Sequence, residues 1–247
     1  MNVSIHAATC AAWPESERPG ELPRPAGLEP GVWRRFSRLS RLAAGVLSPL
    51  LDAAGGALDR AEAPLYFGTG LGEFSSTYTF LKSLIQRGPA GASPLAFQNS
   101  VHNAAAGHLS IAFGLTGPSE TLCAGDHTTL RTFERAMAGV LATSAPALVV
   151  LADDLGDDAA AGWRLAAERQ GWQGAVLAEG AAAFLIGPSG AGGAPLTLHD
   201  HGAAPFDRRA GAFCTADAQV LAQAFRARRA VQVGLTGGPG LALEFPG

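Results

Sequence analysis

The segment "GPSETLCAGDHTTLRTFERA", residues 117–136, predicts a strand, a sharp turn and a helix. Such a turn often presents a nucleophile, because a helix N-terminus offers free N–H groups and the positive end of the helix dipole. A cysteine there would have a lowered pKa. Here the tip of the turn is Asp126, followed by His127, and Cys123 lies just upstream. An aspartate would cap the helix well but would be a poor acyl carrier.

Asp126 and His127 are also a candidate pair for a hydrolase or a decarboxylase. Adjacent residues at a helix start point apart, which is a poor geometry for two cooperating groups. Cys123 falls inside the predicted strand, where we expect its thiol to be buried. Two interpretations of the turn are therefore open at this point, an altered active site and a tight corner with a capping carboxylate.

Two further motifs carry weaker signals. The sequence "GTGLGE", residues 68–73, lies between a strand and a helix, as a dinucleotide fingerprint would. Its third glycine is replaced by Glu73, so we interpret it as a plain tight turn. His199 and His201 of "HDH" would share a face of one strand. No third ligand stands at a recognisable spacing, so we expect a surface strand end and no metal site.

The remaining candidates are two histidines and an acidic segment. His102 and His108 lie on a predicted apolar helix but point to different faces, so we expect them to be packed or hydrogen-bonded. The segment "DDLGDD", residues 153–158, lacks the glycine and glutamate spacing of a calcium loop. We therefore expect these carboxylates to be solvated.

The composition indicates an ordinary globular protein. The chain has 247 residues, of which 47% are apolar and 16% charged, with a formal net charge of −3. Lys82 is the only lysine and no basic run occurs, so nothing indicates a nucleic-acid partner. Cys10, Cys123 and Cys214 form no CxxC pair, which argues against a zinc site or a disulfide framework. No apolar run reaches the ~18 residues of a membrane span. We expect a soluble, reduced, cytoplasmic protein without a metal or cofactor.

Strands and helices alternate along the chain. The predicted strands are 2–12, 63–70, 120–125, 147–154, 174–188, 195–200 and 230–237. The predicted helices are 32–55, 73–88, a largely buried one ending at 115, 127–143, 160–171 and 216–228.

This alternation predicts an α/β fold with a mainly parallel sheet flanked by helices. The loop 188–194 is a candidate boundary, but the piece after it is too short to stand alone. We therefore expect a single domain over residues 1–247, with residues 190–247 as a divergent C-terminal extension of it.

The run "NAAAGHLSIAFGLTGPSETLCAGDHTTLRTFERA" resembles the N-terminal half of β-ketoacyl synthases. Three further pieces resemble that family in the same order, namely "YFGTGLGE", "SPLAFQNSVHNAAAGHLSIAFGLTGPS" and "GAVLAEGAAAFLIGP". The resemblance covers roughly residues 1–190. It implies a thiolase-like fold, which has two similar halves, each with a mixed sheet between helices. This chain would hold essentially one half.

The resemblance also places the family's catalytic residues. The synthases use a cysteine in the N-terminal half and two histidines in the C-terminal half. Counting from the motif Gly117, Pro118 and Ser119, the cysteine position falls on Asp126. The motifs around the two histidines are absent from residues 190–247.

The resemblance implies roles for further residues around this position. Gly117, Pro118, Ser119 and Gly125 would shape the elbow. Bulky residues such as Phe97 and Phe113 would line an acyl tunnel together with Asp126, although ordinary core packing explains either phenylalanine alone.

A synthase-like chain without its nucleophile is similar to the chain length factors of type II polyketide synthases. It is also similar to a shorter group of proteins of aryl polyene and xanthomonadin-type pathways. The resemblance implies a non-condensing subunit that pairs with an active ketosynthase, as a heterodimer or homodimer, and meets acyl carrier protein. Two alternatives are open, a stand-alone pseudoenzyme that binds acyl-CoA or acyl carrier protein, and a hydrolase or decarboxylase using Asp126 and His127.

Overall fold

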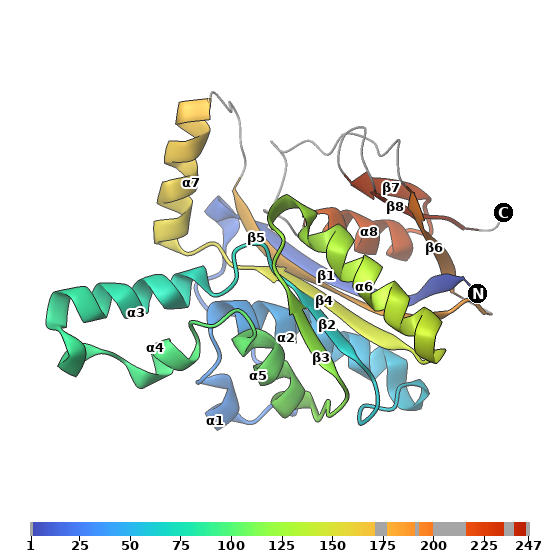
Figure 1. The fold of residues 1–247 in the computed structure, drawn as a ribbon, viewed down its shortest axis with the longest axis horizontal. Helices are drawn as coiled ribbons and strands as arrows, with labels where there is room; N and C mark the ends of the chain where they lie inside the picture. Colours follow the sequence, from blue (N-terminus) through green and yellow to red (C-terminus); the bar gives the residue numbers. More distant parts are fainter. Residues whose placement is uncertain (1, 171–176, 191–192, 200–215, 235–239, 246–247) are drawn as a thin grey trace.

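The computed structural model describes residues 2–170, 177–190, 193–199, 216–234 and 240–245. These residues form a sheet of eight strands in the order β3-β2-β4-β5-β1-β6-β8-β7. Helices cover both faces of this sheet (Figure 1). The mixed sheet between helix layers confirms the expected thiolase-like half.

The sequence periodicity places most elements close to their observed bounds. The strands are β1 Val3–Pro14, β2 Leu65–Gly68, β3 Ser119–Leu122, β4 Ala147–Asp153, β5 Ala178–Pro188, β6 Ala194–His199, β7 Val231–Gly234 and β8 Gly240–Leu243. The helices are α1 Pro30–Trp33, α2 Arg38–Ala54, α3 Phe74–Arg87, α4 Pro94–Gln98, α5 Ala104–Phe113, α6 Thr128–Thr143, α7 Asp157–Gln170 and α8 Ala216–Arg226.

The expectation of a mainly parallel sheet is wrong. Only β2 pairs in parallel, with β3 on one side and β4 on the other. The other pairings between described strands are antiparallel. Two neighbouring strands joined by a helix are parallel only when the connection crosses over a face of the sheet and returns to the end where the first strand began. Helix α7, between β4 and β5, instead projects from the sheet and contacts α3 (Figure 1).

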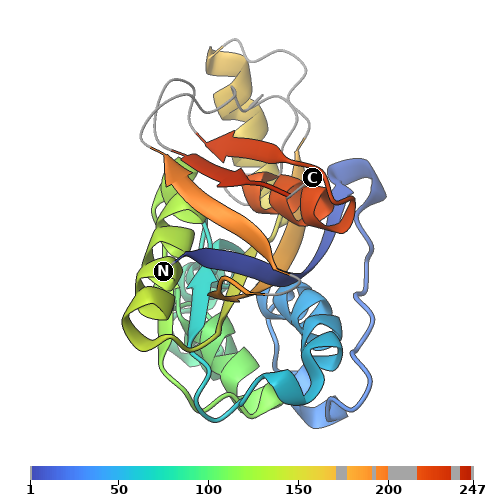
Figure 2. The same ribbon diagram turned by 90° about the vertical axis from the view of Figure 1, so that its right-hand side faces the viewer.

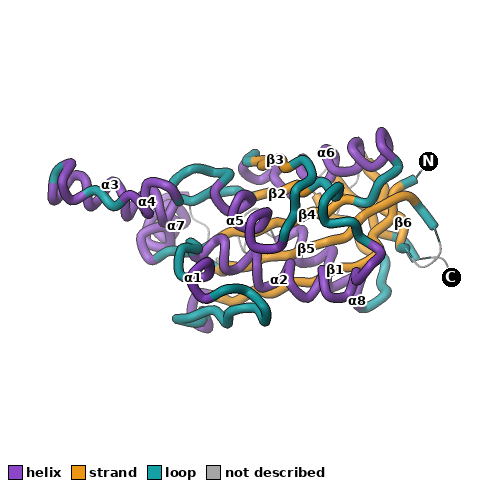
Figure 3. The backbone as a smooth tube through the Cα atoms, turned by 90° about the horizontal axis from the view of Figure 1, so that it is seen from below, coloured by secondary structure: helices purple, strands orange, loops and turns teal. Residues whose placement is uncertain are grey.

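Alternation along the central strands divides the core into two layers. Leu148 and Val150 of β4 pack into the layer under α2 and α5. Their neighbour Val149 packs into the opposite layer with Phe184 of β5. Helices α6 and α8 cover that second face (Figures 2 and 3). Because a strand has a period of two, one apolar run serves both layers.

The C-terminal strands continue the same sheet. Val3 of β1 pairs with Leu196 of β6, and Leu196 pairs in turn with Leu243 of β8. Strand β8 has no counterpart in the prediction. The described part of residues 190–247 thus shares its sheet and its apolar layer with the N-terminal strands.

Two predicted helices differ from the structure. The helix expected at 32–55 is divided into α1 and α2, because Ser37 caps α2 by accepting a hydrogen bond from the Ser40 amide at 3.1 Å. Helix α5 is buried on one side only, and its Ile111 is 79% exposed. None of the described helices is long and apolar enough to cross a membrane.

Candidate functional site

The candidate site lies where the three mutually parallel strands end. Strands β3, β2 and β4 run side by side in the same direction, so their carboxyl ends meet at one edge of the sheet. Ligand sites of α/β sheets often lie at such an edge. The loops that follow these strands begin at Cys123, Thr69 and Asp154.

The elbow after β3 is a short 3-10 turn, Gly125–His127, that leads into α6. Gly125 has φ +55, a conformation that glycine adopts at little cost. The Thr128 hydroxyl donates to the carbonyl of Gly125 at 2.7 Å and accepts from the amide of Ala124 at 3.0 Å. Thr128 is fully buried, so this hydroxyl holds the elbow in place.

The expected capping role of Asp126 stays a prediction. The N-cap residue of α6 is His127, whose own side chain makes no capping hydrogen bond. The Asp126 backbone lies within the preceding turn. A substrate-binding or catalytic role of Asp126, or of His127, stays a prediction.

Asp153, at the end of β4, fixes the loop that follows β2. Its Oδ1 atom accepts hydrogen bonds from the Thr69 hydroxyl at 3.0 Å and from the amides of Gly70 at 2.8 Å and Leu71 at 3.2 Å. A phosphate bound at this glycine turn would need the same amides. The loop therefore has the geometry of a tight turn, as we interpreted it.

The predicted burial of Cys123 is wrong. Strand β3 ends one residue earlier, and Cys123 is exposed. Its Sγ atom lies 3.5 Å from the carbonyl oxygen of Gly70. Partial desolvation, followed by the negative charge of Asp153, raises the pKa of the thiol. A raised pKa reduces the thiolate fraction, which makes Cys123 a weak nucleophile near neutral pH.

The acidic segment 153–158 is also different from the expectation of solvated carboxylates. Asp153 and Asp154 are buried, while Asp157 and Asp158 are exposed. Burial raises the pKa of Asp153 to about 6 and that of Asp154 to about 6. Asp153 is the last residue of the buried strand β4 and Asp154 follows it directly, so the acidic segment begins inside the core.

Two more buried carboxylates lie next to these residues. Glu179 of β5 accepts a hydrogen bond from Arg38 Nε at 2.8 Å and forms a salt bridge with Arg38 Nη2. This contact is the main reason why the pKa of Arg38 is raised. Burial raises the pKa of Glu73 to about 7. The guanidinium of Arg38 thus faces the carboxyl groups of Glu179 and Asp154.

A chain of hydrogen bonds joins Glu73 to His108. The Ser37 hydroxyl donates to Glu73 Oε1 at 2.6 Å, the hydroxyls of Ser37 and Ser40 are 2.8 Å apart, and Ser40 Oγ lies 2.9 Å from His108 Nδ1. His108 also stacks on the ring of Phe36 at 4.9 Å. The expectation that His108 is packed and hydrogen-bonded is confirmed, and the chain connects α2, α3 and α5.

The other predicted histidines are dispersed. His102 precedes α5 and is exposed, with its ring close to Gly72, so its expected place on a buried helix is wrong. His199 ends β6, while His201 lies outside the described residues. The described part of the chain contains no group of three histidine, cysteine or acidic side chains arranged to hold a metal.

The two phenylalanines proposed as tunnel residues occupy different environments. Phe97 on α4 is 61% exposed and lies 5.4 Å from the ring of Phe80. Phe113, the last residue of α5, is half-buried against the core layer under α2. Their role as tunnel residues stays a prediction.

The motif Gly117, Pro118 and Ser119 lies at the start of β3, at the opposite end of the strand from the elbow. The carbonyl of Pro118 accepts a hydrogen bond from the Leu65 amide at 2.8 Å, which begins the pairing with β2. A Cβ atom at Gly117 would lie 2.5 Å from the carbonyl oxygen of Ala63. The motif therefore sets the register of β3, and Gly125 alone among the predicted elbow residues lies in the elbow itself.

Gly117→Ala should lower the free energy of unfolding by about 2 kcal/mol, because the new methyl group must displace backbone atoms of the neighbouring segment. Gly107→Ala is the matched control. Nothing lies within 4 Å of a Cβ atom there, and alanine favours the helix. Urea unfolding should show a loss for the first variant and none for the second. Equal midpoints would contradict the close approach at Gly117.

The fold and the sequence both match known proteins. The family model "Beta-ketoacyl synthase, N-terminal domain" matches residues 8–186. A ketosynthase in complex with its chain length factor from Xenorhabdus doucetiae contains a chain with 17% identity and a TM-score of 0.71. The match covers 99% of this chain and 100% of that one. No curated protein matches this chain.

Two other solved structures have the same fold. The ishigamide ketosynthase/chain length factor matches with 17% identity and a TM-score of 0.75 over 100% of both chains. A type II polyketide synthase acyl-carrier protein in complex with its ketosynthase (AntDE:AntF) matches with 15% identity and a TM-score of 0.76 over 98% of both chains. Together with the family match over most of the sequence, these similarities show that the chain belongs to the β-ketoacyl synthase N-terminal domain family.

Proposed function

We propose that this chain is a non-condensing subunit of the chain-length-factor type. It pairs with an active ketosynthase in type II fatty acid or polyketide biosynthesis, of the aryl polyene kind, and meets acyl carrier protein in that complex. One observation carries the proposal. The elbow in which the family places its nucleophile holds Asp126, and the nearby thiol, Cys123, has a raised pKa.

The chemistry of these two residues disfavours condensation. An acyl anhydride on Asp126 would hydrolyse readily, so a carboxylate is a poor carrier of an acyl chain. Cys123 lies next to the negative charge of Asp153, which opposes formation of its thiolate. The active partner would supply the cysteine and both histidines.

The unpaired long side of strand β3 supports pairing with another chain. Strand β3 is the outermost strand on its side. Pro118 and Leu122 accept hydrogen bonds from β2, so the alternate residues Ser119 and Thr121 direct their backbone groups to the free edge. Such an edge is a template for a further strand. The exposed Ile111 of α5, a helix that contacts β3, adds apolar surface beside it.

The matched structures support the same proposal. Two of them contain a ketosynthase together with a chain length factor, and this chain covers essentially the whole length of the matched chain in each. The likeness is one of fold, and the pairing itself is our proposal.

Pairing can be tested by co-expression with the ketosynthase of the same gene neighbourhood, followed by size-exclusion chromatography with light scattering. We expect a heterodimer. Thr121→Pro should weaken it at least tenfold, because proline removes an N–H group directed to the free edge. Thr121→Val keeps that N–H and should pair normally. A chain that stays monomeric beside its synthase would overturn the proposal and favour a stand-alone binder.

Acylation gives a second test. Incubation of the purified chain with acylated carrier protein should leave both Asp126 and Cys123 unmodified, for the reasons given above. Intact-protein mass spectrometry would measure this, with the active ketosynthase as the positive control. A stable adduct on Cys123 would contradict the non-condensing assignment.

A further inference from the structure

We infer that the buried carboxyl group of Glu73 is a pH-sensitive attachment for an arm of the protein, residues 73–103, and that its ionisation favours detachment of this arm from α2. The arm consists of α3, α4 and the segments around these two helices. The inference describes a conformational device within the fold. It goes beyond the proposed function and does not depend on it.

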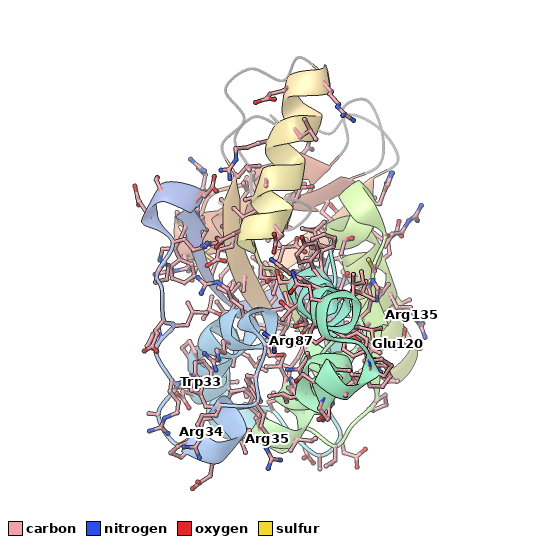
Figure 4. The ribbon with its side chains drawn as sticks, turned by 90° about the vertical axis from the view of Figure 1, so that its left-hand side faces the viewer. Trp33, Arg34, Arg35, Arg87, Glu120 and Arg135 are labelled. Atoms are coloured by element: carbon pink, nitrogen blue, oxygen red, sulfur yellow. The ribbon has the colours of Figure 1, made fainter. Side chains whose placement is uncertain are left out.

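The arm projects from the rest of the molecule (Figures 1 and 3). Figure 4 looks along α3 from its far end, which carries Arg87. Helices α3 and α4, which the structure describes in full, contain no buried residue. Helix α3 also contacts α7, which itself projects from the sheet. Helices in proteins are stabilised mainly by burial of an apolar face, so this arm depends strongly on contacts at its root.

Glu73 makes the polar contact at the start of the arm. The Ser37 hydroxyl donates to its Oε1 atom at 2.6 Å, and the Ser76 hydroxyl donates to its Oε2 atom at 2.9 Å. Ser37 is also the N-cap residue of α2 and accepts a hydrogen bond from the Ser40 amide at 3.1 Å. The carboxyl group thus joins the first residue of the arm to the start of a helix that is part of the core.

A second polar contact holds the other end of the arm. The Asn99 side chain, just after α4, donates to the carbonyl of Arg35, just before α2, at 3.0 Å. The Thr77 hydroxyl donates to the carbonyl of Ser100 at 3.0 Å and so joins the two ends of the arm. Amide and hydroxyl groups of this kind do not ionise near neutral pH. Of these root contacts, the one through Glu73 is therefore the one that responds to pH.

The charges around Glu73 disfavour its ionised form. Glu73 is 2% exposed, and the nearby buried carboxyl group of Asp154 opposes a second negative charge. Arg38 follows the capping serine of α2, but its guanidinium is engaged by Glu179, with Nε 2.8 Å from Oε2 and a salt bridge through Nη2. An ionised Glu73 would be a buried carboxylate without a cation of its own.

The other titratable groups at the root do not neutralise this charge. His108 of α5 is joined to Glu73 through two serine hydroxyls, but burial lowers the pKa of its ring, so the imidazole is neutral where Glu73 ionises. The ring of His102 lies close to Gly72 but is exposed, and solvent screens a charge there. Asp153 is an acid and binds the loop that precedes the arm.

Ionisation and detachment are therefore coupled. Burial raises the pKa of Glu73 to about 7 in the closed form, from a usual value of 4.5. When the arm detaches, the carboxyl group meets water and ionises at the lower value. The equilibrium constant for detachment should then rise about tenfold for each pH unit between these two values and level off above about pH 7. The closed form is most favoured below about pH 4.5, where both forms are protonated.

Hydrogen exchange of the full chain, followed by mass spectrometry at about pH 5 and about pH 8, tests the inference. After correction for the intrinsic exchange rates, the protection of the α3 amides should fall at least tenfold at the higher pH. Low concentrations of urea should change this exchange little, because detachment exposes little surface. Glu73→Gln should remove most of the fall, since glutamine cannot ionise. Glu134→Gln, on α6, is the matched control and should keep it.

The attachment that does not ionise gives a further comparison. Asn99→Ala should speed the exchange of α3 at both pH values and keep the fall between them, because it removes a contact that is independent of pH. Loss of the fall in this variant would contradict the assignment to Glu73.

Three other results would overturn the inference. Constant protection of α3 between the two pH values in the wild-type protein would do so, and that result requires no variant to fold. A fall that persists in Glu73→Gln would show that another group is responsible. Exchange of α3 with the same urea dependence as that of the core strand β4 would show that the arm opens only when the whole protein unfolds.

Discussion

Asp153→Ala should lower the free energy of unfolding by about 3–5 kcal/mol, while Asp153→Asn should lower it less, by about 1–3 kcal/mol. The carboxylate accepts three hydrogen bonds through one oxygen, from Thr69, Gly70 and Leu71. Alanine leaves all three donors without that acceptor, and each unsatisfied buried group costs about 1–3 kcal/mol. Asparagine keeps the accepting oxygen and has the same shape.

The two variants distinguish the role of Asp153 as a hydrogen-bond acceptor from the role of its negative charge. Its Oδ2 atom is buried without a hydrogen-bond partner in the described part of the chain, and burial raises the pKa of the group to about 6. An asparagine therefore keeps the acceptor at Oδ1, and its cost comes from the buried NH2 group that replaces Oδ2. Chemical denaturation of both variants measures the difference, with Asp158→Ala, at an exposed position, as the control. A large loss in the asparagine variant would show that the negative charge itself holds the loop.

Local sequence patterns predict the order of the elements well. The small, apolar run at 174–188 predicts a long buried strand, and β5 is fully buried along most of its length. The turn after β3 is also where the sequence places it, because a strand, a glycine and an amphipathic helix follow one another there. These features depend on neighbours in the sequence, which periodicity describes.

Features that depend on distant residues could not be predicted. The burial of Asp153 requires the donors of a loop more than eighty residues earlier in the chain. The antiparallel pairing of β4 with β5 depends on the direction in which α7 leaves the sheet. A single sequence shows neither the donors around Asp153 nor the direction of α7, so its local patterns predict solvated carboxylates and a mainly parallel sheet.

In the candidate site, too, local sequence patterns predict some features, while others depend on distant residues. The family motif locates Asp126 at the nucleophile position by counting residues, and the elbow lies there in the structure. The burial of Cys123 was predicted wrongly because the strand ends at Leu122, one residue before the thiol. The link from Glu73 to His108 passes through two serine hydroxyls on α2, and no spacing rule indicates such a contact.

The stability of the protein should fall as the pH rises from about 4 to about 7. Burial raises the pKa of Glu73 to about 7 from a usual value of 4.5, and those of Asp153 and Asp154 to about 6 from 3.8. The folded chain therefore keeps protons that the unfolded chain has lost. A group with a raised carboxyl pKa contributes stability below its unfolded pKa and loses it as the pH passes the folded value.

Each unit of pKa shift changes the free energy of unfolding by about 1.4 kcal/mol, so the shift of Glu73 alone accounts for about 3 kcal/mol. His108 acts in the opposite direction, because burial lowers its pKa and its contribution is lost below its usual pKa of 6.5. The loss of stability should therefore be steepest between about pH 4.5 and about pH 6, where all three carboxyl groups keep protons that the unfolded chain has lost, and it should level off above about pH 7, once Glu73 is ionised in the folded chain as well. Urea unfolding across this range should show a falling midpoint.

Glu73→Gln should flatten this dependence, because glutamine cannot ionise. Ser37 and Ser76 donate to different oxygens of Glu73, so the glutamine oxygen accepts from one hydroxyl and its NH2 group donates to the other. The partly exposed Glu134, which pairs with Arg131 on the surface of α6, is the matched control. Glu134→Gln should leave the pH profile unchanged, since a surface ion pair contributes little. A midpoint that rises with pH in the wild-type protein would show that the buried acids are already ionised in the folded state, held by Arg38 and by hydrogen bonds.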